Sequence, residues 1–404
     1  MNNIAVIGGG AAGLTAAISA ARMGAKVTVY ERMDRMAKKI LSTGNGRCNM
    51  TNENADLENY HGKNPKFVNG VIHKFWVRET LEFFGGLGVM TKTEEEGKIF
   101  PYSLQAAAVS EALRLEVQRL GIKEVCSFEV CEIKKNKEKF ILKAYNGETA
   151  VCDSVVIACG GKAAPNLGSN GSGYDLAQKL GHKVTKLYPA LVQIKTDNTY
   201  TKSLQGLKIW GVAGFYENDK LIKESEGEIL FTDYGLSGPP IFNISRSAST
   251  SQNGEIRIDM MPEYSEEMIY SILNERKYLG RNLESYFTGM LPKKLGQVMM
   301  KACGIAPLSR MSDSLGKKEI SELAKKIKAW KFPVKGTMSW NNAQVTAGGV
   351  EVENINPNTM ESKLVSGVYF AGEILDIDGD CGGYNLQWAW SSGYVAGENA
   401  AMKK

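Results

Sequence analysis

The 404-residue sequence contains little of what metal centres and disulfide frameworks are built from. It has three histidines, and its seven cysteines are scattered without a CxxC pair, which is typical of reduced cytosolic thiols. No HExxH motif or paired-carboxylate arrangement stands out, so we expect no metal site. The GxSxG pattern of a nucleophilic serine is missing, because GLSGP at 235–239 has the wrong spacing. Demanding chemistry must therefore come from a cofactor.

A long uninterrupted apolar run is also missing. The stretch at 4–21 is apolar but is cut by glycines and lacks a basic region before it, so it predicts neither a signal peptide nor a membrane span. The formal net charge of +5 is too small to identify a nucleic-acid-binding protein by itself. We expect a cytoplasmic globular protein without a membrane partner, whose oligomeric state the sequence leaves open.

The N-terminus does carry a dinucleotide-binding pattern. Ile4–Ile7 predicts a short strand, GGGAAG at 8–13 predicts a tight turn, and the Ala-rich residues that follow favour a helix. In this GxGxxG motif Gly8 allows the turn, Gly10 lets a pyrophosphate approach the backbone, and Gly13 lets helix and strand pack closely. The phosphates would lie at the helix N-terminus, where unpaired N–H groups favour anions.

A second strand and an acidic residue strengthen this interpretation. AKVTVY at 25–30 predicts the strand, and Glu31 follows it, eighteen residues past Gly13. A carboxylate at that point can accept hydrogen bonds from a ribose. The combination favours a dinucleotide cofactor over a glycine-rich structural turn.

The far end of the chain indicates which dinucleotide binds. VYFAGE at 368–373 predicts another strand, and a Gly-rich turn then leads into a helix that starts near Tyr384. A C-terminal strand and helix that cross the cofactor a second time suit a long ligand such as FAD. Glu373 could accept hydrogen bonds from the ribityl hydroxyls, and the helix N-terminus could offer N–H groups to the reduced flavin. A second GxGxxG motif is not found, so NAD(P)H would bind without its own Rossmann domain and alternate with the substrate at one flavin face.

The middle of the chain indicates an interrupted nucleotide-binding fold. SVVIACGG at 154–161 predicts a strand beneath the cofactor. A Gly/Ser turn at 168–173 then opens a helix, and this turn is either an ordinary N-capped helix start or a second contact with an anion or the cofactor. Helical periodicity covers 66–87 and 103–120, while 125–156 alternates like strands, with FEVCEI and KFILKA as a hairpin candidate.

After Pro189 the pattern changes to short strands at 190–262 and then to helices at 264–330, and the sheet is expected to resume at 343–352. The domain boundaries that follow are 1–188 for the first part of an FAD-binding domain, 189–262 for an inserted β-rich domain, 263–335 for an inserted helical domain, and 336–404 for the C-terminal part of the FAD-binding domain.

Lys-rich segments mark the helical insertion. KKEISELAKKIKAWK and RKYLGRN are either solvated helix faces or a basic face for RNA or an acidic partner. The aromatic residues Tyr278, Trp330 and Phe332 lie near these segments in the sequence and could stack on bases.

Seven phrases between residues 4 and 397 are shared, in order, with one flavoprotein family. They are IAVIGGGAAGLTAA, KKILSTGNGRCNMTN, GKIFPYS, CGGKAAPNLGSNGSGYDLAQKLGH, GEILFTDYGLSGPPI, AQVTAGGV and YFAGEILDIDGDCGGYNLQWAWSSGYVAG. The chain is identified on them as a member of the BaiN-like family, which also includes aminoacetone oxidase-type and ribosomal-RNA dihydrouridine synthase-type members. The CGG and GSNGSGY phrases also resemble fumarate reductase and ketosteroid dehydrogenase flavoproteins, which act on activated C=C bonds.

The resemblance implies FAD, redox chemistry and an α/β fold. That fold is a Rossmann-like FAD-binding domain of the fumarate reductase and glutathione reductase type, interrupted by an inserted β-rich plus helical domain. In this family the loop at 38–49 wraps the cofactor. Together with the N-terminal cradle, the expected FAD contacts are Gly8, Gly10, Ala12, Gly13, Glu31, Arg32, Lys38, Lys39, Gly46, Arg47, Asn49, Val130, Gly160, Gly372, Glu373, Asn385 and Leu386.

Two residues are candidates for polarising or protonating the substrate. They are Tyr384 and Arg47, although either one could instead serve packing or pyrophosphate binding. Cys48 is either a redox thiol or, in the absence of a partner cysteine nearby, a buried structural thiol.

The expected reaction is the NAD(P)H-driven reduction of a C=C bond conjugated to a carbonyl. The resemblance implies a hydrophobic, steroid-like enone such as a 3-oxo bile-acid intermediate as the substrate. Dihydrouridine formation in ribosomal RNA is the alternative, because the uridine ring is also a conjugated, enone-like system. An aminoacetone-type amine oxidase and a flavin-binding protein without turnover are further alternatives.

Overall fold

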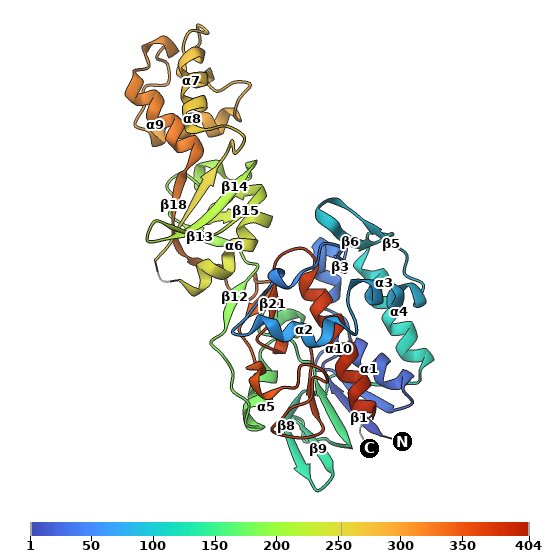
Figure 1. The fold of residues 1–404 in the computed structure, drawn as a ribbon. Coiled ribbons are helices and arrows are strands. Elements are labelled where there is room, and N and C mark those ends of the chain that lie inside the picture. Colours follow the sequence, from blue (N-terminus) through green and yellow to red (C-terminus); the bar gives the residue numbers. More distant parts are fainter. Residues whose placement is uncertain (1, 252, 403–404) are drawn as a thin grey trace. The chain divides into compact units, whose positions relative to one another are not determined.

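A computed structural model describes residues 2–251 and 253–402, which form two compact units (Figure 1). Unit 1 comprises Met1–Pro189 and Trp340–Lys404, and unit 2 is Ala190–Ser339. Each unit has its own hydrophobic core. The four-segment division expected from the sequence stays a prediction. No helix of the described residues is long and apolar enough to cross a membrane.

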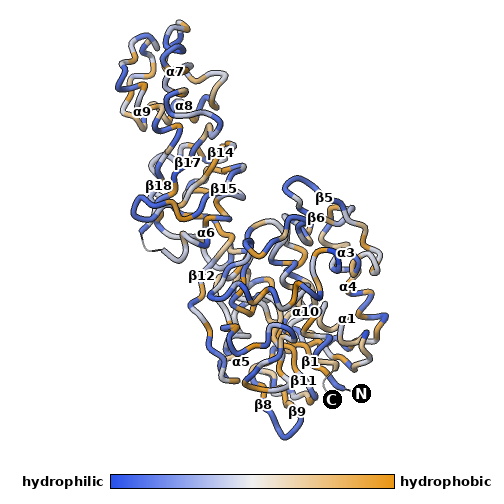
Figure 2. Tube along the Cα trace, in the orientation of Figure 1, coloured by the Kyte–Doolittle hydropathy of each residue, from blue (hydrophilic) through white to orange (hydrophobic). Residues whose placement is uncertain are grey.

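The centre of unit 1 is a five-stranded sheet in the order β20-β11-β1-β2-β7. All four of its strand pairings are parallel. Its strands are short and mostly buried, and Figure 2 shows their apolar residues gathered around β1 and β11. The strands expected at both ends of the chain and at 154–161 are confirmed: β1 (Asn3–Ile7), β2 (Lys26–Tyr30), β11 (Ser154–Ile157) and β20 (Val368–Phe370), joined at the edge by β7 (Lys123–Val125).

Two helices from opposite ends of the chain pack against each other beside this sheet (Figure 1). They are α1 (Ala11–Arg22) and α10 (Tyr384–Met402). Their backbones approach closely because a Cβ at Gly393 would lie 2.3 Å from the Ala12 carbonyl oxygen, and one at Gly397 would lie 2.1 Å from that of Ala16. Glycine is therefore required at both positions of α10.

The predicted hairpin is confirmed, with β8 (Val130–Asn136) antiparallel to β9 (Lys139–Ala144). The helices expected at 103–120 and after the Gly/Ser turn are also present, as α4 (Ala106–Arg119) and α5 (Ser172–Lys179). The other elements of unit 1 are β3 (Thr51–Asn52), β4 (Tyr60–His61), β5 (Thr91–Thr93), β6 (Lys98–Pro101), β10 (Thr149–Cys152), β19 (Val345–Ala347) and β21 (Asp378–Gly379), and β12 (Tyr188–Ala190) lies at the unit boundary.

Two expectations about unit 1 were wrong. The helix expected at 66–87 is broken into α2 (Asn69–Ile72) and α3 (Val77–Gly86), because Trp76 is extended (φ −119°, ψ −155°) and its N–H donates to the Glu79 carboxylate at 3.0 Å. That contact starts a new helix. The sheet does not resume at 343–352, since β19 is not a member of the five-stranded sheet and β20 supplies the returning strand.

Unit 2 contains a closed barrel in the order β13-β16-β15-β14-β17-β18 and three helices beyond it. The helices confirm the expectation for 264–330 and are α7 (Glu266–Arg276), α8 (Lys293–Ala302) and α9 (Lys317–Lys328). The barrel strands are β13 (Ile194–Thr196), β14 (Lys208–Glu217), β15 (Lys220–Phe231), β16 (Gly235–Ser237), β17 (Glu255–Asp259) and β18 (Trp330–Thr337).

The expectation that 190–262 holds only short strands was incomplete. A helix, α6 (Pro239–Thr250), lies within it, with Pro at its first turn and buried Ile241, Ile244 and Ala248 at helical spacing. The C-terminal strand β18 also returns from the helical segment to the barrel. Its Trp330 and Phe332 are 1% and 2% exposed, so neither ring is available to stack on a base.

The α1–α10 contact predicts a sharp contrast between two helical glycines. Gly397→Ala should destabilise the protein by about 1–3 kcal/mol, because the added Cβ meets the backbone of α1. Gly85→Ala in α3 has nothing within 4 Å of its Cβ and should stabilise by about 0.5–1 kcal/mol through helix propensity. Urea unfolding of both variants measures the difference. Equal effects would mean that the helices can separate without cost.

Candidate cofactor site

The turn between β1 and α1 leaves the N-terminus of α1 open. Gly10 caps this helix in extended conformation (φ −86°, ψ −166°), and no side chain hydrogen-bonds to the cap. A Cβ at Gly10 would meet nothing within 4 Å, whereas one at Gly13 would lie 1.9 Å from the Gly8 carbonyl oxygen. Gly13 thus permits close packing, and Gly10 leaves free space before N–H groups that favour an anion.

Glu31 joins the loops that follow β1 and β2. Its side chain is buried, and its two carboxylate oxygens accept the N–H groups of Gly9 at 2.7 Å and Met33 at 2.8 Å. Each carboxylate oxygen has two lone pairs, so Glu31 can also accept a hydroxyl hydrogen bond. The loop before β8 also contacts Glu31, because the Phe128 N–H donates to the Glu31 backbone carbonyl oxygen at 2.9 Å. Val130 begins β8 two residues later and is buried.

The loop at 38–49 is tied to the end of β20 by an ion pair. Lys39 Nζ lies 2.7 Å from Glu373 Oε2, and the Thr346 N–H donates to Glu373 Oε1 at 2.9 Å. Gly372, just before Glu373, has a φ of +78°, and a Cβ there would lie 2.7 Å from Ala12 Cβ. Gly372 and Glu373, which follow β20, therefore lie between α1 and the 38–49 loop.

Asn49 and Gly160 also border this region. The Asn49 Oδ1 atom is buried and has no hydrogen-bond partner among the residues that the structure describes. It lies next to the turn before α10, since a Cβ at Gly383 would be 2.9 Å from it. Gly160 follows β11 with a φ of +70°. Open space at Gly10 and an unsatisfied polar atom at Asn49 fit a large polar ligand such as FAD.

Several residues predicted to contact FAD have side chains that bind other groups of the protein instead. Arg47 forms an ion pair with Glu94 at 2.9 Å and lies over the Phe100 ring at 4.2 Å. Asn385 bonds both backbone groups of Gly379, at 2.8 and 2.7 Å. The remaining side chains have these neighbours: Arg32 pairs with Glu129, Lys38 pairs with Asp34, and Leu386 packs against the core of unit 1. Gly46 has a φ of +82° and an open surrounding.

Tyr384 is buried at the start of α10. Its ring meets the Tyr60 ring edge-on at 6.4 Å between centroids, and its carbonyl oxygen accepts the Tyr60 hydroxyl at 3.1 Å. Burial raises the pKa of Tyr384, and Asp380, Glu96 and Cys381 raise it further. The phenol therefore stays protonated at neutral pH.

Cys48 is fully buried, and burial raises the pKa of its thiol to about 12. This favours the structural interpretation of Cys48, because redox reactivity requires a thiolate.

Thr346 is a residue that the sequence patterns did not single out. It is buried, and its Oγ1 accepts the N–H groups of Lys162 at 2.7 Å and Ala163 at 3.0 Å. Through its own N–H it also holds Glu373. It lies in the AQVTAGGV phrase, but nothing in that phrase distinguishes its hydroxyl from an ordinary strand threonine. Among the described residues, no cluster of three or more His, Cys, Asp or Glu side chains could hold a metal ion.

Residues 2–399 match the model of a family described as HI0933-like protein Rossmann domain. A Clostridium scindens protein named 3-dehydro-bile acid delta(4,6)-reductase is 39% identical over all of both chains. A Haemophilus influenzae protein named ribosomal RNA dihydrouridine synthase is 32% identical over 96% of each chain. A solved flavocytochrome c3 fumarate reductase in open conformation is 16% identical over 99% of this chain and 78% of that one, with a TM-score of 0.48, too distant to bear on chemistry.

The open space at Gly10 predicts a ligand-specific effect. Gly10→Val should leave the fold intact, because a Cβ at this position meets nothing within 4 Å, but should weaken FAD binding about ten- to hundredfold by occupying the space before α1. Flavin-fluorescence titration of the apoprotein measures the Kd.

The matched control is Gly316→Val. Gly316 caps α9 of unit 2 in nearly the same conformation (φ −80°, ψ 161°), and its nearest neighbour is 3.7 Å from a built Cβ. This variant should bind FAD like the wild type. Equal Kd values for both variants and the wild type would show that FAD does not use the α1 N-terminus.

Proposed function

The chain belongs to the HI0933-like Rossmann-domain family, and from this premise we propose that it is an FAD-dependent, NAD(P)H-driven enone reductase. It reduces a carbon–carbon double bond conjugated to a carbonyl, in a steroid-like substrate such as a 3-oxo bile-acid intermediate. The observation that carries this proposal is the 39% identity, over the full length of both chains, to a protein named as a bile-acid delta(4,6)-reductase.

The residues around the α1 N-terminus suit FAD. The free N–H groups beyond Gly10 would hold the pyrophosphate, and Glu31 would accept a ribose hydroxyl. The Lys39–Glu373 pair and Asn49 would line the rest of the cofactor. The chemistry that FAD supplies when bound is the transfer of a hydride equivalent from NAD(P)H to an activated carbon.

Tyr384 is the better of the two candidate proton donors. Reduction of an enone requires a proton at the carbon beside the carbonyl and a hydrogen-bond donor to the carbonyl oxygen. The Tyr384 phenol is protonated at neutral pH, and burial and the neighbouring acids raise its pKa further, so it can donate a hydrogen bond to the carbonyl oxygen and is available as the proton source. The Arg47 guanidinium is already engaged by Glu94 and Phe100, which suits a role in holding the 38–49 loop.

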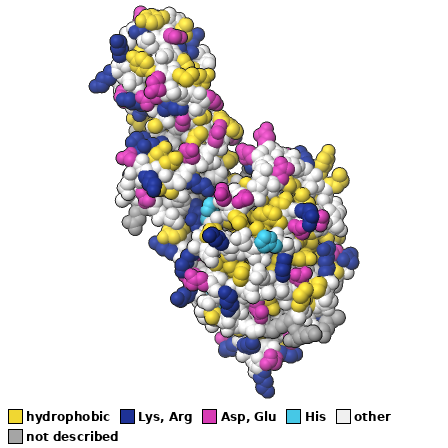
Figure 3. All heavy atoms as spheres, in the orientation of Figure 1, with side chains coloured by type: hydrophobic (Ala, Val, Ile, Leu, Met, Phe, Trp, Pro, Cys, Tyr) yellow, Lys and Arg dark blue, Asp and Glu magenta, His cyan; other side chains and the backbone are white. Residues whose placement is uncertain are grey.

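Ribosomal RNA is the second candidate substrate, because the charge of unit 2 favours it. Residues 263–329 contain twelve basic and eight acidic side chains. The difference between the two counts accounts for most of the formal net charge of +5 that the whole chain carries. Tyr278 is 72% exposed, and Lys277 Nζ lies 4.9 Å from its ring. Against RNA, Figure 3 shows acidic side chains interspersed among the basic ones on the face that it draws. The enone reductase is therefore the first proposal.

The two substrates are distinguished by an anaerobic screen of FAD-loaded protein. NADH or NADPH should bleach the flavin absorbance, and a 3-oxo-Δ4 steroid should restore it with formation of the saturated ketone. A ribosomal-RNA transcript should not. Restoration by the transcript alone, with dihydrouridine in the product, would replace the first proposal by the second. A flavin that neither nucleotide bleaches would contradict both.

Tyr384→Phe should lower the rate of steroid reduction about a hundredfold, the usual contribution of a general acid, and leave the FAD Kd unchanged. Tyr394→Phe is the control, because Tyr394 lies on the same helix and keeps its ring stacked on Phe75 at 4.4 Å. Stopped-flow flavin reoxidation measures the rate. If Arg47→Ala lost this rate and Tyr384→Phe kept it, the proton donor would be assigned to Arg47.

A further inference from the structure

The first turn of α5 lies against the carboxyl ends of two neighbouring strands of the sheet. A Cβ at Gly173 would be 2.7 Å from Cys159 Cβ and 2.8 Å from Ile374 Cδ1. Cys159 follows β11 and Ile374 follows β20. Parallel sheets of this kind bind their ligands outside the carboxyl ends of the strands. The start of α5 is therefore at the edge of the sheet where a cofactor is expected.

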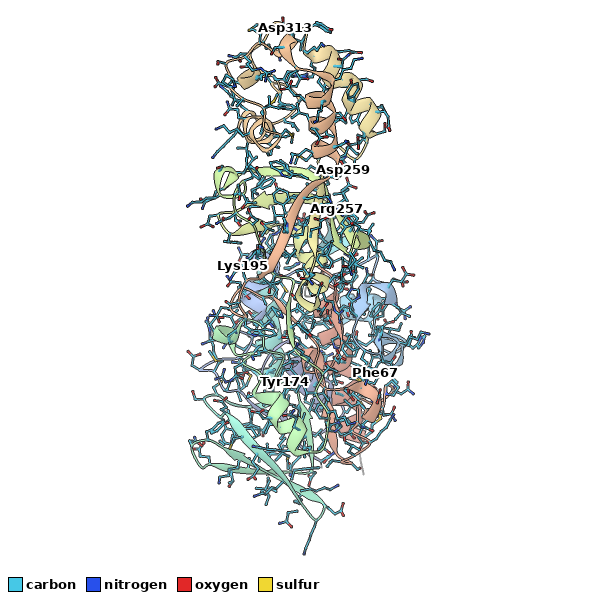
Figure 4. All side chains as sticks on the ribbon, turned by 90° about the vertical axis from the view of Figure 1, so that its left-hand side faces the viewer. Phe67, Tyr174, Lys195, Arg257, Asp259 and Asp313 are labelled. Carbon is cyan, nitrogen blue, oxygen red and sulfur yellow. The ribbon has the colours of Figure 1, made fainter. Side chains whose placement is uncertain are left out.

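Tyr174 lies in this first turn of α5 (Figure 4). Its hydroxyl is buried and is not satisfied by a hydrogen bond of ordinary geometry. The residue is 5% exposed, and no described residue meets its Oη at hydrogen-bond distance and angle, although the Thr346 hydroxyl lies nearby. Two other buried tyrosines are satisfied, since Tyr60 donates to the Tyr384 carbonyl oxygen and Tyr286 donates to that of Leu273. A buried hydroxyl without a partner costs free energy, which a ligand that accepts its proton would recover.

Three further side chains of unit 1 have a buried polar atom without a hydrogen-bond partner among the described residues, and their positions can be compared with that of Tyr174. Ser154 opens β11 and so lies at the opposite, amino end of the strand. His182 already bonds the Ser362 hydroxyl through Nε2 at 2.8 Å. Asn49 borders the cofactor region, as described above. Tyr174 and Asn49 thus share the side of the sheet at which the ligand is expected.

The charges near Tyr174 indicate which half of FAD it meets. Burial raises the pKa of Tyr174, the nearby Glu373 and Asp376 raise it further, and the neighbouring Thr346 hydroxyl lowers it in part. Negative charge disfavours a phosphate, and Lys39 pairs with only one of these acids. A neutral, hydroxyl-rich group suits this environment better than the pyrophosphate, which the α1 N-terminus attracts.

We propose that the Tyr174 hydroxyl donates a hydrogen bond to the riboflavin half of bound FAD. The donor is a phenol that stays protonated, and the acceptor is a ribityl or ring oxygen or nitrogen. This inference rests on the proposed FAD dependence, and it assigns the contact to Tyr174 of α5, a side chain that the sequence patterns did not single out.

The test compares two tyrosine-to-phenylalanine variants as apoproteins. Tyr174→Phe should raise the FAD Kd about three- to tenfold, the effect of one hydrogen bond, and leave the urea midpoint unchanged or higher. Tyr286→Phe in unit 2 should lower the midpoint, because it loses its bond to Leu273, and leave the FAD Kd unchanged. ADP, which lacks the riboflavin half, should displace FAD with the same ADP Kd from Tyr174→Phe as from the wild type.

The outcomes separate the inference from the function on which it rests. An unchanged FAD Kd in Tyr174→Phe, or an equal loss of ADP affinity, would overturn the assignment of Tyr174 to the riboflavin half. A lower urea midpoint in the apoprotein would show a packing role instead. Wild-type protein that binds no FAD would overturn the proposed function itself, and the Tyr174 contact with it.

Discussion

The close approach of α1 and α10 is the contact on which the rest of unit 1 depends. These helices come from opposite ends of the chain, and glycines at 393 and 397 let α10 reach the backbone of α1. Gly372 brings the residues after β20 onto Ala12 in the same way. Because the two chain ends are held together by backbone packing, the chain between β12 and β19 can form a separate unit without disturbing the sheet.

The candidate site is built largely from backbone, and a few carboxylates hold its loops. Glu31 binds the N–H groups of two loops, and Glu373 joins Lys39 to the Thr346 backbone. Each carboxylate thus fixes segments that are distant in sequence and keeps lone pairs for hydroxyl groups. This dual use explains why acids occur in a proposed site for a cofactor that carries many hydroxyl groups.

Sequence patterns predicted the elements whose cause is local. The GxGxxG turn, the apolar runs of β1, β2, β11 and β20, and the helix after the C-terminal Gly-rich turn all appear where they were expected. The break before α3 was missed because it depends on one contact between Glu79 and Trp76. The return of β18 to the barrel was missed because strand pairing between 255–258 and 330–333 leaves no signal in either segment alone.

The sequence by itself determined the Rossmann-type fold and the family, since both reside in short phrases whose glycines and apolar runs act within a few residues. Only the tertiary structure decided how the individual side chains are used. Arg47 and Asn49 are two residues apart, yet one is paired with Glu94 while the other presents an unpaired buried oxygen. Tyr174 and Thr346 likewise gain their significance from segments far away in the chain. The physical reason is that a hydrogen bond depends on position and burial in space, which local sequence does not encode.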